Sequence, residues 1–72
     1  MNKDIFGGNW KQFKGEVQKQ WGWLTDNQFD QINGNFQKMV GAIQEKTGRA
    51  RDAAEKEINE WAEKIRKMRD AA

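Results

Sequence analysis

The chain has 72 residues, with 13 Lys and Arg against 11 Asp and Glu and a formal net charge of +2. It contains no Cys, His, Pro, Tyr or Ser, which excludes disulfides, Cys-based zinc sites and Ser–His or Cys–His catalytic triads. Its length allows one small domain, and with only 36% apolar residues we expect that domain to fold with low stability.

The first predicted helix begins near residue 10, because Asn9 and Gln12 have the spacing of a capping box. Gly22 is expected to end this helix as a left-handed C-cap. Its apolar residues recur in three- and four-residue steps, the period of one helix face: Phe6, Trp10, Phe13, Val17 and Leu24, with Trp21 widening the stripe.

A short second helix is predicted from the N-cap pair Thr25 and Gln28 to about Ile32, where Asn33 and Gly34 form a stop signal. Asn35 is expected to cap a third helix that ends at Gly48. The apolar stripe over this part of the chain again steps by three and four: Phe29, Ile32, Phe36, Met39 and Ile43.

The last predicted helix covers Asp52 to Met68. On its exposed side the pairs Glu60–Lys64 and Glu63–Lys67 have the favourable i,i+4 order. One face of this helix is apolar: Ala54, Ile58, Trp61, Ile65 and Met68.

Glycines mark an internal repeat. Six of the seven fall into two sets with heptad spacing, offset by 26 residues: Gly8, Gly15, Gly22 and Gly34, Gly41, Gly48. Aligning residues 8–26 with 34–52 gives six identities and three apolar similarities, which favours a duplication over a chance likeness between two amphipathic helices. We therefore expect one domain over residues 1–72, with repeat units at 8–33 and 34–60 and a charged helical tail at 61–72.

Gly15 and Gly41 fall inside predicted helices, where glycine costs about 0.5–1 kcal/mol relative to alanine. Two explanations are open. In the first, a missing Cβ lets another helix or a Trp ring pack closely against the backbone. In the second, the helices are built to melt easily. Because both glycines hold the same place in the repeat, the packing explanation is the prediction.

Four segments have a recognisable pattern: residues 8–15 (GNWKQFKG), 20–22 (QWG), 24–26 (LTD) and 41–48 (GAIQEKTG). Together they resemble the CsbD family of small bacterial proteins associated with the general stress response. Residues 1–4 (MNKD) are close to the enterobacterial members, and the likeness spans about residues 1–60. Trp23 stands where Lys is usual, and Thr47 where an aromatic is common, a change expected to loosen packing of the second unit.

This resemblance implies an all-α fold, a small bundle of about four short helices similar to two helical hairpins packed crosswise. The family has no established catalytic site to carry over, so no catalytic, cofactor-binding or metal-binding residue is expected. Hydrophilic, glycine-bearing members are also grouped with hydrophilins, proteins linked to water-deficit tolerance. The implied function is non-catalytic protection under stress, through weak or transient contacts with other macromolecules.

Nucleic-acid binding is the alternative function. Cations and rings alternate near the N-terminus in a pattern that places charge beside stacking surfaces, although the aromatic residues are also needed for the core. The residues concerned are Lys3, Lys11, Lys14 and Lys19, interleaved with Trp10, Phe13 and Trp21.

The remaining predictions concern enzyme activity, localisation, oligomeric state and Trp23. Asp26 and Asp30 share a helix face, but solvated carboxylates are commoner than catalytic ones, so no enzyme activity is expected. The dense acidic residues oppose membrane binding, and residues 1–15 show no signal-peptide pattern, so a cytoplasmic protein is expected. The final helix either closes the bundle or pairs between chains, giving a monomer or a weak homodimer. Trp23 is expected to cover the edge of the bundle rather than to be an exposed contact point.

Overall fold

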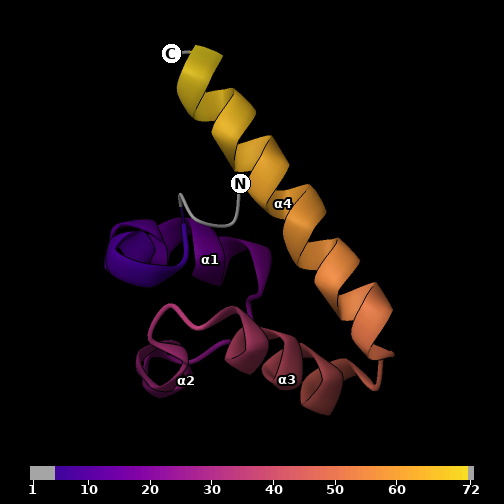
Figure 1. Ribbon diagram of the computed structural model, residues 1–72. Coiled ribbons are helices and arrows are strands. Elements are labelled where there is room, and N and C mark those ends of the chain that lie inside the picture. Colours follow the sequence, from indigo (N-terminus) through magenta and orange to yellow (C-terminus); the bar gives the residue numbers. More distant parts are fainter. Residues whose placement is uncertain (1–4, 72) are drawn as a thin grey trace.

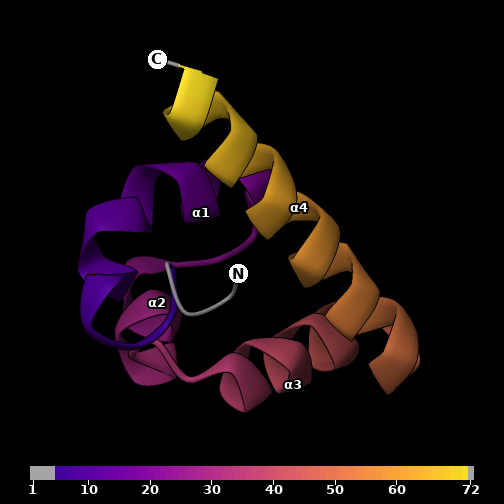
Figure 2. The same cartoon turned by 45° about the horizontal axis from the view of Figure 1, so that its top comes forward.

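A computed structural model describes the backbone of residues 5–71 and the side chains of residues 5–68 (Figure 1). Over this range the chain forms a 3-10 helix, η2, followed by four α-helices and no strand, which confirms the all-α class. The elements are η2 (Gly7–Phe13), α1 (Lys14–Gln20), α2 (Asp26–Ile32), α3 (Phe36–Thr47) and α4 (Arg51–Ala71). In both views α4 leaves the end of α3, passes α1 and extends beyond the other helices (Figures 1 and 2).

The first helix differs from its prediction. The chain turns helical at Gly7 rather than near residue 10, with Phe6 as an N-cap that makes no side-chain cap bond, and α-helical geometry begins only at Lys14. The predicted capping box at Asn9 is therefore wrong. The cause is tertiary: the Gly7 N–H donates to the carbonyl of Gly34 at 2.9 Å. This contact fixes the backbone three residues before the predicted start.

Helices α2 and α3 confirm their predicted boundaries. The Thr25 hydroxyl accepts from the Gln28 N–H at 3.1 Å, and the Gln28 side chain accepts from the Thr25 N–H at 3.0 Å, which completes the capping box. Asn33 ends α2 in the left-handed region at φ 47°. The Asn35 side chain accepts from the Lys38 N–H at 3.1 Å and so caps α3.

Of the two predicted glycine C-caps, one is confirmed. Gly48 ends α3 with φ 74°. Gly22 does not adopt positive φ, and α1 ends instead at Trp21 with φ −118°. The physical reason is that Trp21 is held in the core, 3% exposed, so the chain turns at the tryptophan before it reaches the glycine.

The core draws on all four α-helices and on η2. Val17 of α1, Ile43 of α3 and Ile58 of α4 are completely buried, as the apolar spacing predicts. The described residues of the core are Ile5, Phe6, Trp10, Val17, Trp21, Leu24, Phe29, Ile32, Met39, Val40, Ile43, Ala54, Ile58, Trp61 and Ala62.

Two further predictions concern the ends of α3 and α4. Thr47 lies at the surface, where its hydroxyl donates to the Ile43 carbonyl at 2.7 Å. Because Ile43 is nevertheless fully buried, the second unit closes its core without an aromatic residue at position 47. On α4 the apolar face leaves the bundle gradually: Ile65 is half-buried and Met68 is 63% exposed.

The prediction that Gly15 and Gly41 permit close helix packing is wrong. A Cβ added to either residue would meet no atom within 4 Å beyond its own helix, and neither has positive φ. Close approach of one backbone segment to another occurs instead at Gly34, which lies against Gly7. A Cβ there would lie 2.7 Å from the backbone N and O of Gly7, and its φ is 79°.

Candidate functional site

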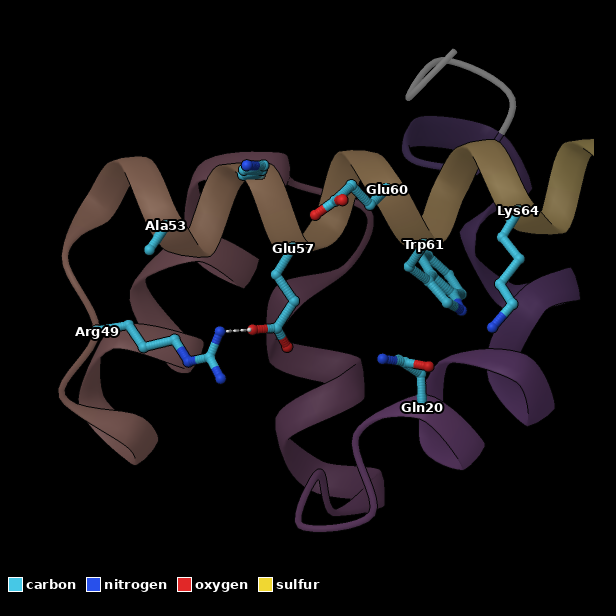
Figure 3. A pocket seen from close by; sticks show the side chains of 8 residues that line it. Gln20, Arg49, Ala53, Glu57, Glu60, Trp61 and Lys64 are labelled. Carbon is cyan, nitrogen blue, oxygen red and sulfur yellow. Dashed lines mark ion pairs between the residues drawn. The ribbon is translucent and has the colours of Figure 1, made fainter.

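A polar groove on the described surface runs between the end of α1 and the first half of α4 (Figure 3). Figure 3 shows Gln20 and Lys64 converging on the ring of Trp61, while Arg49 and Glu57 pair at the other end. The lining residues come from α1, from the link before α4 and from α4 itself: Gln20, Arg49, Ala53, Lys56, Glu57, Glu60, Trp61 and Lys64.

Glu57 is the centre of this groove. One carboxylate oxygen, Oε2, accepts a hydrogen bond of 2.6 Å from the indole N–H of Trp21, 36 positions earlier in the sequence. The other oxygen lies 3.0 Å from a guanidinium nitrogen of Arg49, a charge pair without a well-aligned hydrogen bond. Glu57 therefore ties three segments together: the end of α1, the α3–α4 link and α4.

The floor of the groove is aromatic. The rings of Trp21 and Trp61 meet edge to face, with centroids 4.8 Å apart, an arrangement that adds about 0.5–1.5 kcal/mol to the area both rings bury. Trp21 is 3% exposed and Trp61 5%, so these rings close the groove without presenting a face to solvent. They are part of the core.

The chemistry available in this groove is ionic. Its volume, about 560 Å³, lies in the range of small-molecule sites, but such sites are lined mainly by apolar side chains. Here five of the eight lining residues are charged. The carboxylate of Glu57 is already occupied by Trp21 and Arg49, so its role is structural. The arrangement suits weak polar contacts better than bond making and breaking.

A second polar cluster joins α1 to the start of α2. The Asp26 carboxylate accepts from the Gln18 amide at 2.8 Å and lies 3.4 Å from the Lys14 ammonium. The Gln18 hydrogen bond and then the Lys14 charge lower the pKa of Asp26 below its usual value of 3.8. Gln18 also donates to the Leu24 carbonyl at 3.2 Å. Asp26, considered above with Asp30 as a carboxylate pair, thus has a structural use.

The residues proposed to stack on nucleic-acid bases are mostly not at the surface. Trp10 is 2% exposed and Trp21 3%, and Phe13 is half-buried against the core. Lys14 is engaged with Asp26 and lies 5.8 Å from the ring centre of Phe29. Lys11 and Lys19 are exposed, whereas Lys3 lies outside the described residues.

Sequence reasoning missed Glu57 and Arg49. Both lie in a stretch, residues 49–70, in which more than half of the residues are charged. Their importance depends on Trp21, a partner that no local spacing reveals. Trp23 is half-buried against the core, in keeping with an edge cover. The sequence predicts an ion pair between Glu63 and Lys67. In the structure the Glu63 carboxylate lies 3.9 Å from the guanidinium of Arg66.

Metal-binding clusters and membrane-spanning helices are both absent from the described part of the chain. No cluster of three or more acidic side chains there is arranged to hold a metal ion. None of the described helices combines the length and apolar character that crossing a bilayer requires.

The chain is similar in sequence to a known protein family and to several bacterial proteins. Residues 4–56 match the family model described as CsbD-like. The UPF0337 protein YjbJ of Escherichia coli K12 is 56% identical over 61 residues, covering 85% of this chain and 88% of that protein. The Salmonella typhimurium YjbJ is 54% identical over 85% of this chain and 87% of its own length.

A more distant relative covers more of the chain. The UPF0337 protein pc0632 of Protochlamydia amoebophila is 44% identical over 66 residues, 92% of this chain and all of that protein. No solved structure matches. The family match therefore extends into α4 as far as Lys56 and includes Gln20, Arg49 and Ala53 of the groove.

Proposed function

The chain belongs to the CsbD-like family of bacterial general stress response proteins, and from this premise we propose that it is a non-catalytic protective protein. It acts through weak, transient contacts with other macromolecules when water is scarce, in the manner of a hydrophilin. The proposed place of action is the cytoplasm, which cell fractionation tests.

One observation carries this proposal: Gly15 and Gly41 face open space inside their helices. Each lowers helix stability by about 0.5–1 kcal/mol relative to alanine, and neither gains a packing contact in return. A chain that keeps two such positions is easily remodelled, as transient contact with varied partners requires. This supports the second of the two explanations for the helix glycines.

The charge distribution supports the same function. A third of the residues are charged, and among the described residues none of these side chains is buried. Both signs are interspersed along the exposed face of α4, an arrangement that keeps a protein soluble and limits tight binding to any one charged partner.

The experiment is to dry and rehydrate a labile enzyme with this protein and to measure recovered activity. We expect better recovery than with an equal mass of a rigid helical protein of similar size. The Gly15→Ala/Gly41→Ala double variant, which stiffens both helices at positions without neighbours, is expected to protect less than the wild type. Equal recovery with the rigid control contradicts the proposal.

Nucleic-acid binding is less well supported, because Trp10 and Trp21 are packed in the core. Any binding through Lys11 and Lys19 would be electrostatic and would weaken steeply with salt. Retention on DNA measured across a salt series distinguishes the two functions. Tight, salt-dependent retention would favour the nucleic-acid alternative.

A further inference from the structure

The N-terminal strap, residues 5–13, is held by one corner of the molecule. The Gly7 N–H donates to the Gly34 carbonyl at 2.9 Å, and the Trp10 indole N–H donates to the buried Phe29 carbonyl at 3.0 Å. Both acceptors lie within residues 29–36, which join the end of α2 to the start of α3. This corner is the receiving surface for the strap.

Aromatic rings make up the rest of the contact. Trp10 is stacked between Phe6, with centroids 5.1 Å apart, and Phe29, at 4.5 Å. Phe6 also meets the ring of Phe36 edge to face at 5.5 Å. Phe29 is only 2% exposed because the Trp10 ring lies over it. Removing the strap therefore uncovers an aromatic patch, which we define as Phe29 and Phe36.

The strap is weakly built in itself. Residues 7–13 form a 3-10 helix, in which runs longer than three or four residues are uncommon because the hydrogen-bond geometry is poorer than in an α-helix. Gly7 and Gly8 open it, and Phe6 provides no side-chain cap. The outward residues of η2 are exposed. The strap's order therefore depends on its anchors in the corner.

We propose that the strap is an internal occupant of a binding surface: it opens ahead of the rest of the fold, and the aromatic patch then takes an aromatic-bearing segment of a partly unfolded protein chain. The strap itself shows the chemistry that the patch accepts. It presents two aromatic side chains four positions apart, Phe6 and Trp10, one backbone N–H for Gly34 and one indole N–H for Phe29. This inference rests on the proposed protective function and names the partner class.

Native-state hydrogen exchange tests the opening in the full-length protein. We expect the amides of residues 7–13 to exchange at least tenfold faster than those of Met39 and Ile43 in α3, through an opening that leaves α3 and α4 protected. Trp10→Phe keeps a ring but removes the indole hydrogen bond, which leaves the Phe29 carbonyl with the Asn33 N–H alone. Strap exchange is therefore expected to accelerate about tenfold further. Equal exchange rates in the strap and α3 overturn the proposal.

A pair of glycine variants provides the matched test. Gly8 and Gly22 both have open space at the Cβ position and neither has positive φ, but only Gly8 belongs to the strap. Gly8→Ala reduces the freedom of the opened strap and is expected to slow its exchange about two- to fivefold. Gly22→Ala is expected to leave strap exchange unchanged. The same slowing in both variants contradicts a separate strap opening.

Binding is tested with a synthetic peptide of residues 5–14 (IFGGNWKQFK) as the probe. Trp10→Ala removes the main anchor, and we expect this variant to bind the peptide in calorimetric titration at least tenfold more tightly than the wild type does. The same peptide with alanine in place of tryptophan is the control and is expected not to bind. If Trp10→Ala loses α3 protection, the titration is made with Trp10→Phe.

The two proposals fail in different ways. Failure of the peptide to bind a variant whose α3 and α4 remain protected overturns the strap inference, whatever the drying experiment shows. Fast strap exchange and tight peptide binding without any protection of a dried enzyme uphold the strap inference and overturn the protective function.

Discussion

The glycine repeat aligns residues 8–26 with 34–52, but the helical parts of the two segments, at 7–20 in the first and 36–47 in the second, are built differently. The second segment is one regular α-helix, α3, capped at its start by Asn35 and at its end by Gly48. The first is a 3-10 helix joined to the short α1, without a side-chain cap at its start. The first is instead held by two indole hydrogen bonds, from Trp10 to Phe29 and from Trp21 to Glu57.

This contrast teaches that apolar spacing decides which residues enter the core, while anchoring decides the type of helix. Val17 and Ile43 hold equivalent repeat positions and are both fully buried. A 3-10 helix rises about 0.5 Å more per residue than an α-helix, so seven residues reach about 3.5 Å farther. The first segment contacts Gly34 through Gly7 at one end and Glu57 through Trp21 at the other. The duplication itself stays a prediction.

The largest expected effect comes from Gly34→Ala, which attacks the anchor of the first segment. The new Cβ would lie 2.7 Å from Gly7 backbone atoms at a positive φ, and we expect a loss of about 3 kcal/mol or more. Gly48→Ala is the matched control, since it has positive φ but open space, with an expected loss of about 1 kcal/mol. Urea unfolding followed by far-UV circular dichroism measures both, and equal losses would show that the Gly7–Gly34 contact is unimportant.

Removing the Glu57 side chain, which accepts the Trp21 hydrogen bond at the end of the first segment, is expected to have the next largest effect. Glu57→Ala leaves the Trp21 indole N–H in a half-buried position without its acceptor, at an expected cost of about 1–3 kcal/mol. Glu57→Gln keeps an acceptor and loses only the charge pair with Arg49, so about 0.2–1 kcal/mol is expected. The same unfolding experiment compares them. Equal destabilisation by the two variants would mean that the indole bond contributes little.

Replacing the glycines inside α1 and α3 is expected to stabilise both segments. Gly15→Ala in α1 and Gly41→Ala in α3 meet no neighbouring atom within 4 Å, and each is expected to add about 0.5–1 kcal/mol to the free energy of unfolding. Thermal unfolding of the single variants measures the gain. A loss of stability at either position would restore the packing explanation.

The smallest effect concerns the link from α1 to α2. The pKa of Asp26 is lowered by the Gln18 hydrogen bond and by Lys14, so its contribution is fully present above the ordinary pKa of 3.8 and is lost as pH falls through the folded-state pKa. Asp26→Asn is expected to flatten the acid side of the stability profile. Acid titration followed by circular dichroism from pH 6 to pH 2 tests this, and an unchanged profile would dismiss the link.

Local signals were sufficient in α2 and α3, where each cap residue and its partner are close in the sequence. Thr25 with Gln28, Asn33, Asn35 and Gly48 all behave as predicted, because caps and stops depend on three or four neighbouring residues. The same reasoning placed Ile43 in the core, since helix period decides which face is buried.

Contacts between distant segments were beyond that reasoning. The 3-10 start at Gly7 depends on Gly34, and the central place of Glu57 depends on Trp21 and Arg49. The error at Gly22 has the same origin, because burial of Trp21 turns the chain one residue early. For the candidate groove, the sequence predicted that Trp61 is buried but not which charges surround it.

The placing of the tryptophans gives the protein its own optical reporters. Trp10 is stacked on Phe6 and Phe29 at one end, whereas Trp21 and Trp61 lie 4.8 Å apart at the other. Indoles at that separation share excitation energy, so the pair behaves as a coupled chromophore. Once the fourth tryptophan, Trp23, is replaced by phenylalanine, time-resolved fluorescence can follow Trp10 and this pair in dilute buffer or in a drying film, without any attached dye.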